Sequence, residues 1–216
     1  MLSALQRRVA IVLADLPEAE GFALAGGGAL IVRGAVDRET RDLDFFVGEA
    51  DAVDRLLPAL EAALTAGHLA VERRQVAHGF ARLSVTAGDD HTEVDLCVDY
   101  RLLPTEPSPV GPTLSLEELA ANKLLALFSR AEARDFVDFA ALEPVYGLEH
   151  LCRLAADKDA GFDRTVLAEM LGRVDRIPDD ELLLDQQQLA SLRHSVLGWR
   201  LQLARPAPGR GRGRER

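Results

Sequence analysis

The sequence predicts an α+β fold, in which a small mixed sheet with helices on one side is followed by a helical region. Strand and helix patterns alternate in the first third of the chain, three strand-like runs follow, and helical periodicity begins after Ser115. Four prolines in residues 103–112 mark a loop or linker between the two parts. We therefore expect a mixed α/β domain over residues 1–112, a helical region over 113–204 and a basic, disordered tail over 205–216.

The first domain is expected to begin with a helix over residues 2–14, because apolar residues recur there at helical spacing and Pro17 ends the pattern. A short apolar strand over 21–25 runs into the triple glycine at 26–28, and a short helix over 29–33 follows. The remaining expected elements are a strand over 42–47, a helix over 51–66, and strands over 69–76, 80–86 and 92–100.

The helical region begins at Ser115, where Ser115-Leu116-Glu117-Glu118 has the pattern of a capping box at a helix N-terminus. Helical periodicity then continues almost to the end of the chain. After this first helix, further helices are expected over residues 134–143, 148–157, 164–174 and 185–203.

The composition sets limits on the function. The chain has 216 residues, 48% of them hydrophobic, and its 25 Lys+Arg against 35 Asp+Glu give a net charge of −10. This charge excludes a strongly basic nucleic-acid binder, so any RNA contact needs a local basic patch or acts through metal and phosphate. The two cysteines form no zinc or disulfide pattern, and Cys97 lies in a run typical of a buried small hydrophobe. No signal-peptide or membrane-spanning pattern is present, so we expect a cytoplasmic protein.

The most informative motif is the pair Asp42 and Asp44, which are separated by Leu43. Alternate residues of a strand face the same side, so the two carboxylates would lie side by side while Leu43 enters the core. Converging carboxylates repel unless a cation joins them, and oxygen ligands favour Mg²⁺ or Mn²⁺ bound partly through substrate phosphates. The alternative is an Asp pair on a solvated strand end.

Gly26 and Gly27 stand between a strand and a helix, upstream of this pair. Glycines at such a turn let the backbone approach a phosphate closely, and the helix N-terminus offers free N–H groups to an anion. The alternative is a tight turn packed against the sheet.

Asp95 is a candidate third carboxylate, on the polar face of an alternating strand. A lone Asp there is usually solvated, but beside Asp42 and Asp44 it becomes a credible ligand. Three carboxylates can hold two divalent ions, which activate an attacking hydroxyl and stabilise a leaving phosphate. Glu93 and Asp99 are competing candidates on the same face.

A basic stripe is expected on the first helix of the second region. At 3.6 residues per turn Lys123, Arg130 and Arg134 fall along one line, where three cations could meet a triphosphate. The alternative is a solvated helix face. Asp135 and Asp138 could pair with Arg130 or Arg134 instead of acting directly.

Together these motifs resemble the nucleotidyltransferase superfamily and, within it, the AbiEii/AbiGii-type toxins. In that family a Gly-Gly/Ser turn precedes an Asp-x-Asp pair, as the glycines at 26–28 precede Arg38-Glu-Thr-Arg-Asp-Leu-Asp-Phe-Phe46. Its second signature is a lysine-bearing helix leading to Arg-Asp-x-x-Asp, here Lys123 to Arg130 and then Arg134-Asp135-Phe136-Val137-Asp138. Members often carry Ser where this chain has Thr40, which keeps the hydroxyl. The match covers roughly residues 22–142.

The resemblance implies a metal-dependent enzyme that transfers a nucleoside monophosphate from an NTP to an acceptor hydroxyl, in some members the 3′ end of tRNA. Such toxins halt translation and are usually neutralised by a neighbouring antitoxin protein. The expected site comprises metal ligands Asp42, Asp44 and Asp95, further catalytic residues Lys123 and Asp135 (with Asp138 as the alternative acid), and nucleotide-binding residues Gly26, Gly27, Thr40, Arg41, Lys123 and Arg130.

Two other functions stay open at this point. The acceptor could be a small molecule, as in aminoglycoside-modifying nucleotidyltransferases, or the fold could be a catalytically degenerate module that binds a nucleotide or a protein partner. The sequence also leaves open which NTP is used and whether the protein forms an oligomer.

Overall fold

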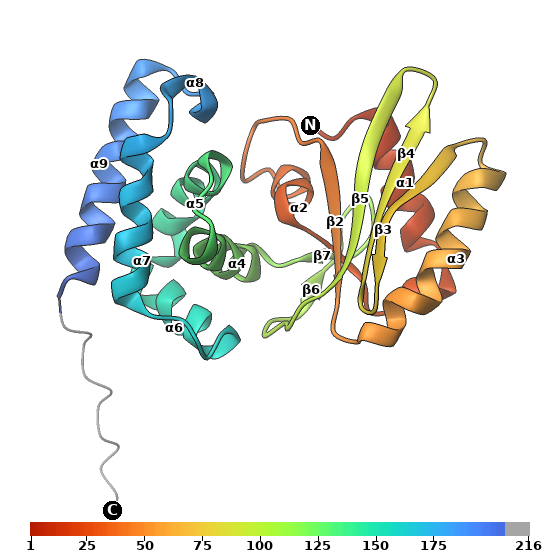
Figure 1. Ribbon diagram of the computed structural model, residues 1–216, viewed down its shortest axis with the longest axis horizontal. Coiled ribbons are helices and arrows are strands. Elements are labelled where there is room, and N and C mark those ends of the chain that lie inside the picture. Colours follow the sequence, from red (N-terminus) through yellow and green to blue (C-terminus); the bar gives the residue numbers. More distant parts are fainter. Residues whose placement is uncertain (206–216) are drawn as a thin grey trace, which may run out of the picture. The chain divides into compact units, whose positions relative to one another are not determined.

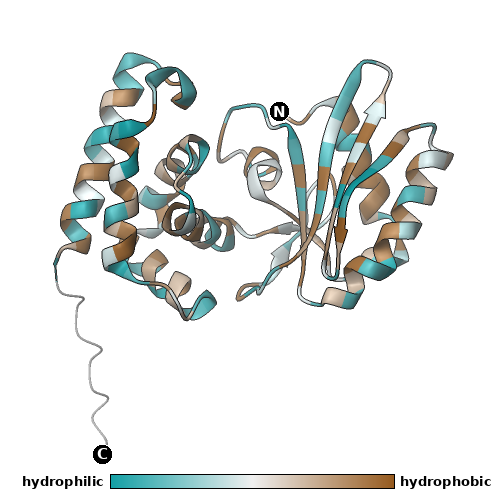
Figure 2. Ribbon diagram, in the orientation of Figure 1, coloured by the Kyte–Doolittle hydropathy of each residue, from teal (hydrophilic) through white to brown (hydrophobic). Residues whose placement is uncertain are grey.

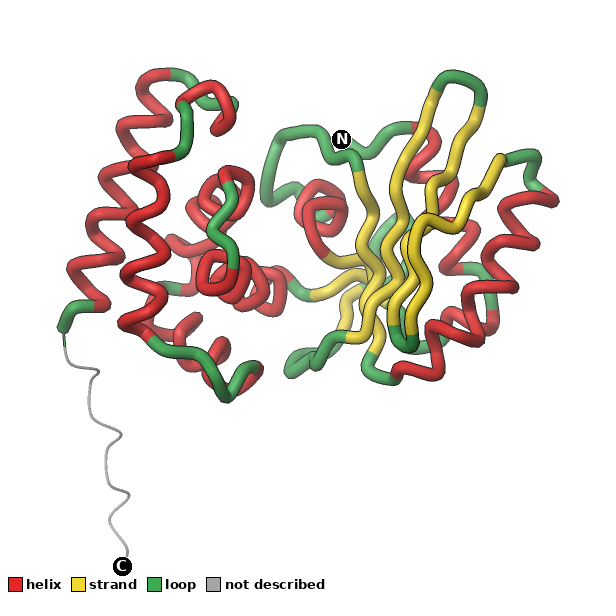
Figure 3. Tube along the Cα trace, viewed as in Figure 1, coloured by secondary structure: helices red, strands yellow, loops and turns green. Residues whose placement is uncertain are grey.

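The computed structural model describes residues 1–205, which divide into two compact units, Met1–Ala120 and the residues from 121 onward (Figure 1). The first unit contains a β-sheet with helices, whereas residues 121–205 consist of helices and loops (Figure 3). The predicted fold class is confirmed. The domain boundary expected between residues 112 and 113 stays a prediction, and residues 206–216 of the expected tail lie outside the described part of the chain.

One mixed sheet forms the centre of the first unit. Its strands are β1 (Ala23–Ala25), β2 (Asp42–Val47), β3 (Ala70–Ala77), β4 (Phe80–Ala87), β5 (Asp90–Val98), β6 (Thr105–Glu106) and β7 (Thr113–Leu114). Their order across the sheet is β3-β4-β5-β2-β1-β7-β6. The pairs β2–β5 and β1–β7 are parallel, and the other pairs are antiparallel.

The helices of the first unit are α1 (Ala4–Ala14), α2 (Gly26–Val32) and α3 (Ala50–Ala66), with a 3₁₀ turn η1 (Pro17–Ala19). Ser3 and Gln6 form a capping box at the start of α1, whose buried residues include Leu5, Val9 and Leu13. Helices α1 and α3 pack against each other and against the sheet on one of its faces (Figure 1).

The alternation predicted for the strands is present in β2, where Leu43, Phe45 and Val47 are buried while the residues between them are half-buried. Strand β4 shows the same pattern as alternating hydrophobic and hydrophilic bands in Figure 2. The buried residues of these strands form the core under α1 and α3, so the polar residues of β2 face the opposite side of the sheet.

The proline-rich segment differs from the loop or linker that we expected. It contains β6, and β7 follows it directly; the two strands pair with each other and extend the sheet beyond β1. Leu24 of β1 is the register partner of Thr113 in β7. Strands of two residues are too short to show any periodicity in the sequence, so this pattern gave no signal.

The second unit is built from helices. They are α4 (Leu116–Ser129), which begins in the first unit, α5 (Ala133–Tyr146), α6 (Leu148–Lys158), α7 (Arg164–Leu171), the 3₁₀ turn η2 (Gly172–Arg176), α8 (Asp179–Leu182) and α9 (Gln186–Leu203). The rings of Phe139 and Trp199 join α5 to α9 in an edge-to-face contact, with centroids 4.9 Å apart. The oxygen of Ser115 accepts a hydrogen bond from the N–H of Glu118, as the predicted cap requires.

Candidate active site

Asp42 and Asp44 lie on one face of β2, as the strand pattern predicted, and both are half-buried. Leu43 between them is fully buried on the other face. The hydroxyl of Thr40 donates a hydrogen bond of 2.7 Å to Oδ1 of Asp42. Thr40 therefore orients the first carboxylate, which gives this predicted site residue a defined structural role.

Gly26 lies directly against the second carboxylate. A Cβ atom on Gly26 would lie 1.8 Å from Oδ2 of Asp44, and the residue has a φ of +55°. The cause is the pairing of β1 with β2, in which Ala25 is the register partner of Asp44. No side chain fits at this position, so the glycine leaves the Asp44 carboxylate in contact with the backbone of the turn.

Gly27 packs against Arg38, a residue that the sequence did not identify as part of the site. A Cβ atom on Gly27 would lie 2.7 Å from Nη2 of Arg38 and 3.3 Å from Oγ1 of Thr40. We expected Arg41 here, but its side chain is exposed, whereas Arg38 is half-buried. Arg38, Thr40 and Asp42 share alternate spacing, which is the one signal that could have identified Arg38. That signal is weak because residues 33–41 form turns and bends instead of a strand.

Asp95 is placed next to Asp44 by the sheet, because the two residues are register partners in the parallel pair β2–β5. Its carboxylate, however, is turned toward β4. Arg82 donates two hydrogen bonds to it, from Nε to Oδ1 at 2.7 Å and from Nη2 to Oδ2 at 2.5 Å. Asp95 is buried, with 7% of its surface exposed. The backbone of Asp95 is thus next to that of Asp44, but its carboxylate is bound by Arg82.

The pKa of Cys97 reflects the negative charge on this face of the sheet. Burial, followed by the negative charges of Asp95 and Asp44, raises the pKa of the Cys97 thiol to about 12. The thiol is therefore protonated at neutral pH, as expected for a small hydrophobe. Of the two competing acids, Glu93 is exposed and Asp99 is half-buried beyond the end of β5.

The donor set on β2 fits a hard divalent cation. Asp42 and Asp44 offer only oxygen ligands from one strand face, which suits Mg²⁺ or Mn²⁺. Gly26 lets the Asp44 carboxylate lie against the backbone of the turn, at the place where a larger residue would push it away. Asp42 and Asp44 are the residues that would hold the ion.

A different group of possible metal ligands lies elsewhere in the first unit. Within residues 1–205, Asp51, Asp54 and His78 form a group whose ligand atoms all lie within 4.8 Å of one another, whereas Asp42, Asp44 and Asp95 do not. All three residues of that group are exposed. His78 and Asp54 are 3.1 Å apart and already pair with each other, so an interaction between the start of α3 and the β3–β4 turn is sufficient to explain them.

In the second unit, Lys123, Asp135 and Asp138 form a buried ionic cluster with Arg130. Nζ of Lys123 lies 2.8 Å from Oδ2 of Asp138 and 3.5 Å from Oδ1 of Asp135. Arg130 donates to both oxygens of Asp135, at 2.9 and 3.0 Å. Both aspartates are fully buried and Lys123 is 7% exposed. The cluster joins α4 to α5, in agreement with the predicted pairing of Asp135 with Arg130.

The charge balance of this cluster keeps Asp135 ionised. Burial by itself raises the pKa of Asp135, but the hydrogen bonds from Arg130 and the charge of Lys123 outweigh it and leave the pKa below its ordinary value. The helix N-terminus adds a further hydrogen bond, since the N–H of Glu132 donates to Asp135 at 3.3 Å.

The expected stripe of three cations on one helix is wrong. Helix α4 ends at Ser129, Ala131 adopts a left-handed conformation with a φ of +48°, and Arg134 belongs to α5. Arg134 pairs with Glu132 at 3.3 Å. The separate helix expected over residues 134–143 agrees with this break. The stripe extended helical spacing across it, over a turn that contains neither glycine nor proline, the residues that usually mark one.

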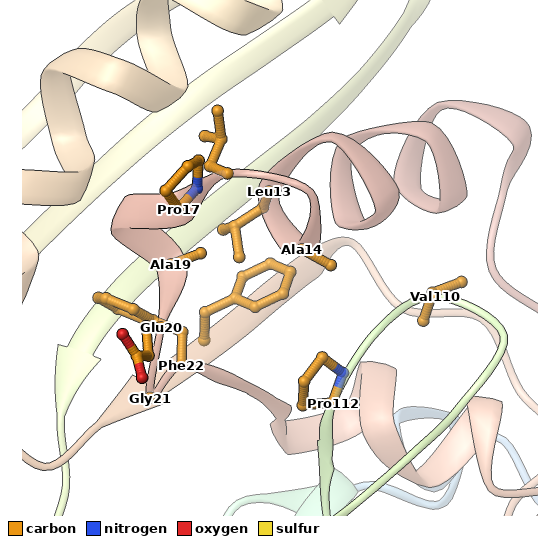
Figure 4. A pocket seen from close by; sticks show the side chains of 11 residues that line it. Leu13, Ala14, Pro17, Ala19, Glu20, Gly21, Phe22, Val110 and Pro112 are labelled. Carbon is orange, nitrogen blue, oxygen red and sulfur yellow. The ribbon is translucent and has the colours of Figure 1, made fainter.

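A cavity of about 480 Å³ in the first unit has none of the predicted site residues in its lining, part of which is labelled in Figure 4. Phe45 contributes to its wall, and Phe45 points to the face of β2 opposite Asp44. Glu20 is the charged residue among its lining. Its apolar walls suit neither a metal ion nor a triphosphate. The other lining residues are Leu13, Ala14, Leu16, Pro17, Ala19, Gly21, Phe22, Val110 and Pro112.

Comparison with known proteins agrees with these motifs. Residues 9–196 match the family model described as nucleotidyl transferase AbiEii toxin, type IV toxin–antitoxin system. The chain belongs to the AbiEii family. Membership of the AbiEii family gives it the character of a nucleotidyltransferase toxin that uses a nucleotide and has an antitoxin as partner. This confirms the resemblance inferred from Asp42, Asp44 and the Arg134–Asp138 element.

Two solved structures have a similar fold. JHP933 from Helicobacter pylori is 21% identical with a TM-score of 0.56, and covers 94% of this chain and 92% of its own. A putative nucleotidyltransferase from H. pylori is also 21% identical, with a TM-score of 0.50 and 93% of each chain covered. Comparison with curated proteins gives no match. In the described part of this AbiEii-family chain, no helix has the length and apolar character needed to cross a membrane.

Proposed function

We propose that this AbiEii-family protein transfers a nucleoside monophosphate from an NTP to a hydroxyl at the 3′ end of tRNA. The observation that carries the proposal is the contact between Asp44 and Gly26. It joins a carboxylate pair on β2 to a turn of glycines, against which the side chains of Asp44 and Arg38 pack closely. A metal-bound triphosphate needs both features, because the carboxylates bind the metal and glycines at the turn let its backbone N–H groups approach the phosphates.

In the proposed reaction the acceptor hydroxyl gives up its proton to solvent and its oxygen forms a bond to the α-phosphorus. The bond from that phosphorus to the bridging oxygen of pyrophosphate breaks, and pyrophosphate leaves. Asp42 and Asp44 would hold a Mg²⁺ or Mn²⁺ ion, which would neutralise the charge of the phosphates. Thr40 fixes the Asp42 carboxylate through its hydrogen bond. The guanidinium of Arg38, which lies against Gly27, adds a positive charge beside the glycine turn. These groups work by positioning and by charge, with no covalent step on the protein.

Lys123 and Asp135 are proposed as the functional residues of the second unit, with Lys123 as a phosphate ligand. Their ion pairs with Asp138 and Arg130 hold both side chains in fixed positions. A preorganised lysine loses little conformational entropy when it binds an anion, which favours such a role. The net charge of −10 argues against general RNA affinity, so recognition of tRNA would be local and would act through the site itself.

The experiment is incubation of the purified protein with each of the four α-labelled NTPs and total tRNA, followed by mass spectrometry of the tRNA 3′ ends. The expected result is addition of nucleotides from one preferred NTP. The matched control is the Asp42→Asn/Asp44→Asn variant, which should add none while keeping its circular dichroism spectrum.

A parallel incubation replaces tRNA by small hydroxyl compounds, including aminoglycosides. Labelling of a small molecule but not of tRNA would show that the acceptor is a small molecule, and nucleotidyl transfer would still be the reaction. Binding of no nucleotide by the folded protein would contradict the proposal and favour a degenerate module. Expression in cells should arrest growth, and co-expression of an adjacent antitoxin gene should relieve it.

A further inference from the structure

Two carboxylates on the polar face of the sheet occupy neighbouring positions. Asp44 and Asp95 are register partners in the parallel pair β2–β5, and adjacent strands lie about 4.8 Å apart. Asp42 precedes on the same face of β2. Charges of the same sign on neighbouring strands raise the energy of the folded state unless cations are present. Each carboxylate therefore needs a cation that neutralises it, either a side chain of the protein or a metal ion.

For Asp95 this cation is the guanidinium of Arg82. Arg82 is the register partner of Asp95 in the antiparallel pair β4–β5 and binds both carboxylate oxygens, at 2.5 and 2.7 Å. The carboxylate side chain is 10% exposed and the arginine side chain 40%. The ring of Phe80 lies 5.9 Å from the guanidinium and supports it from the side. A bidentate guanidinium satisfies a carboxylate much as a metal ion does, with a fixed geometry.

We infer that Arg82 takes the place of a second metal ion, so that the protein binds one divalent cation with its nucleotide, through Asp42 and Asp44. Asp95 is then a positioning residue that holds Arg82 beside the site, and it is not a metal ligand. This inference rests on the proposed function and departs from the expectation that three carboxylates hold two ions. It also accounts for the direction in which the Asp95 carboxylate is turned.

The first unit contains a matched comparison for this ion pair. Arg73 of β3 binds Glu61 of α3 in the same bidentate manner, at 2.6 and 2.5 Å. That pair is away from Asp42 and Asp44, on a neighbouring strand of the same hairpin. Removal of the Arg73 charge is therefore a control. It tests whether the loss of an arginine away from the site also changes the number of metal ions bound.

The experiment counts Mn²⁺ ions bound per chain by electron paramagnetic resonance, in the presence of a non-hydrolysable NTP. The reference protein and all variants carry Asp51→Ala/Asp54→Ala, which removes both carboxylates of the exposed group of Asp51, Asp54 and His78 as a competing site. The reference protein should bind one Mn²⁺ per nucleotide-bound chain. Arg82→Gln should bind two and show a spin-coupled pair, because Asp95 loses its counter-charge. Arg73→Gln and Arg82→Gln/Asp95→Asn should each bind one.

The outcomes separate the inference from the proposed function. Two Mn²⁺ ions in the reference protein, reduced to one by Asp95→Asn, would overturn the inference and leave nucleotidyl transfer intact. An Arg82→Gln variant that folds and still binds one ion would also overturn it. If Arg82→Gln does not fold, the counts for the reference protein and Asp95→Asn decide. If no Mn²⁺ or nucleotide binds to the reference protein, the proposed function is contradicted together with the inference.

Discussion

Gly26 and Asp44 approach each other so closely that a Cβ atom on Gly26 would lie 1.8 Å from Oδ2 of Asp44. The glycine turn and the acidic strand are therefore one structural unit, although 18 positions separate them in the sequence (44 − 26). The unit arises because β1 runs directly into α2, while its last residue, Ala25, pairs with Asp44. Substitutions at the turn are thus expected to act on the carboxylate.

Gly26→Ala should displace the Asp44 carboxylate and weaken binding of Mg²⁺–NTP by about 10–100-fold, the range seen when a ligand loses its support. The control is Gly34→Ala, because Gly34 also has a positive φ, +70°, but has no atom within 4 Å of a built Cβ. Both variants should lose about 1–2 kcal/mol of folding free energy through backbone strain. Titration calorimetry and urea unfolding measure the two effects. Equal nucleotide affinities in the two variants would contradict the contact as a functional one.

Lys123→Met should destabilise the second unit by about 3 kcal/mol, because it leaves the buried carboxylate of Asp138 without its ion pair to Lys123. The comparison is Arg193→Met, which removes an exposed ion pair with Asp179 and should cost less than about 1 kcal/mol. Urea unfolding measures both. The single tryptophan, Trp199, lies in α9 against Phe139 and reports this unit by its fluorescence.

The double variant Lys123→Met/Asp138→Asn should recover part of the stability lost by Lys123→Met, since it removes the buried charge that was left behind. Nucleotide binding should not recover in this variant, because the proposed phosphate ligand is still absent. Recovery of both stability and nucleotide binding would show that Lys123 serves the structure alone.

The stability of the second unit should depend on Asp135 in acid. Despite its burial, Asp135 has a folded-state pKa below the ordinary value of 3.8, because Arg130 and Lys123 favour its charged form. A carboxyl with a lowered pKa contributes its full stabilisation above the unfolded-state pKa, and this is lost as the pH falls through the folded-state value. The free energy of unfolding should therefore fall more steeply below about pH 4 in wild type than in Asp135→Asn. Urea unfolding between about pH 3 and pH 6 measures the two slopes, and equal slopes would contradict the pairing.

Both cysteines should be unreactive in the folded protein. Burial and the charges of Asp95 and Asp44 raise the pKa of Cys97 to about 12, and burial raises that of Cys152 to about 11. Since the thiolate is the reactive form, labelling by a disulfide reagent at pH 8 should be at least about 100-fold slower than in denaturant. Two thiols should react after unfolding. A thiol that reacts rapidly without denaturant would contradict this environment.

The sequence predicted the parts of the fold that depend on local pattern. The alternation in 42–47 placed Asp42 and Asp44 on one face, and Ser115 marked the start of α4. It did not predict the pairing of Asp95 with Arg82, because register between strands β4 and β5 depends on the whole sheet. The packing of Arg38 against Gly27 was missed for a similar reason, since an irregular loop has no period.

The short strands β6 and β7 and the break at Ala131 show a second limit. A strand of two residues forms because it pairs with neighbouring strands of the sheet. The sequences of Thr105–Glu106 and Thr113–Leu114 therefore contain no pattern that predicts a strand. At Ala131 a non-glycine residue adopts a left-handed conformation that tertiary packing imposes. The ionic pairs of Lys123 and Arg130 with Asp135 follow from this turn, which brings α5 back against α4.

Titration calorimetry of a non-hydrolysable NTP with Mg²⁺ into wild type and into Asp42→Asn/Asp44→Asn tests whether the two carboxylates of β2 bind the metal–nucleotide. Wild type should bind the nucleotide only when Mg²⁺ is present, and the double variant should lose this binding while its thermal unfolding temperature is maintained. Equal affinity of the folded double variant for the nucleotide would contradict a metal site on β2.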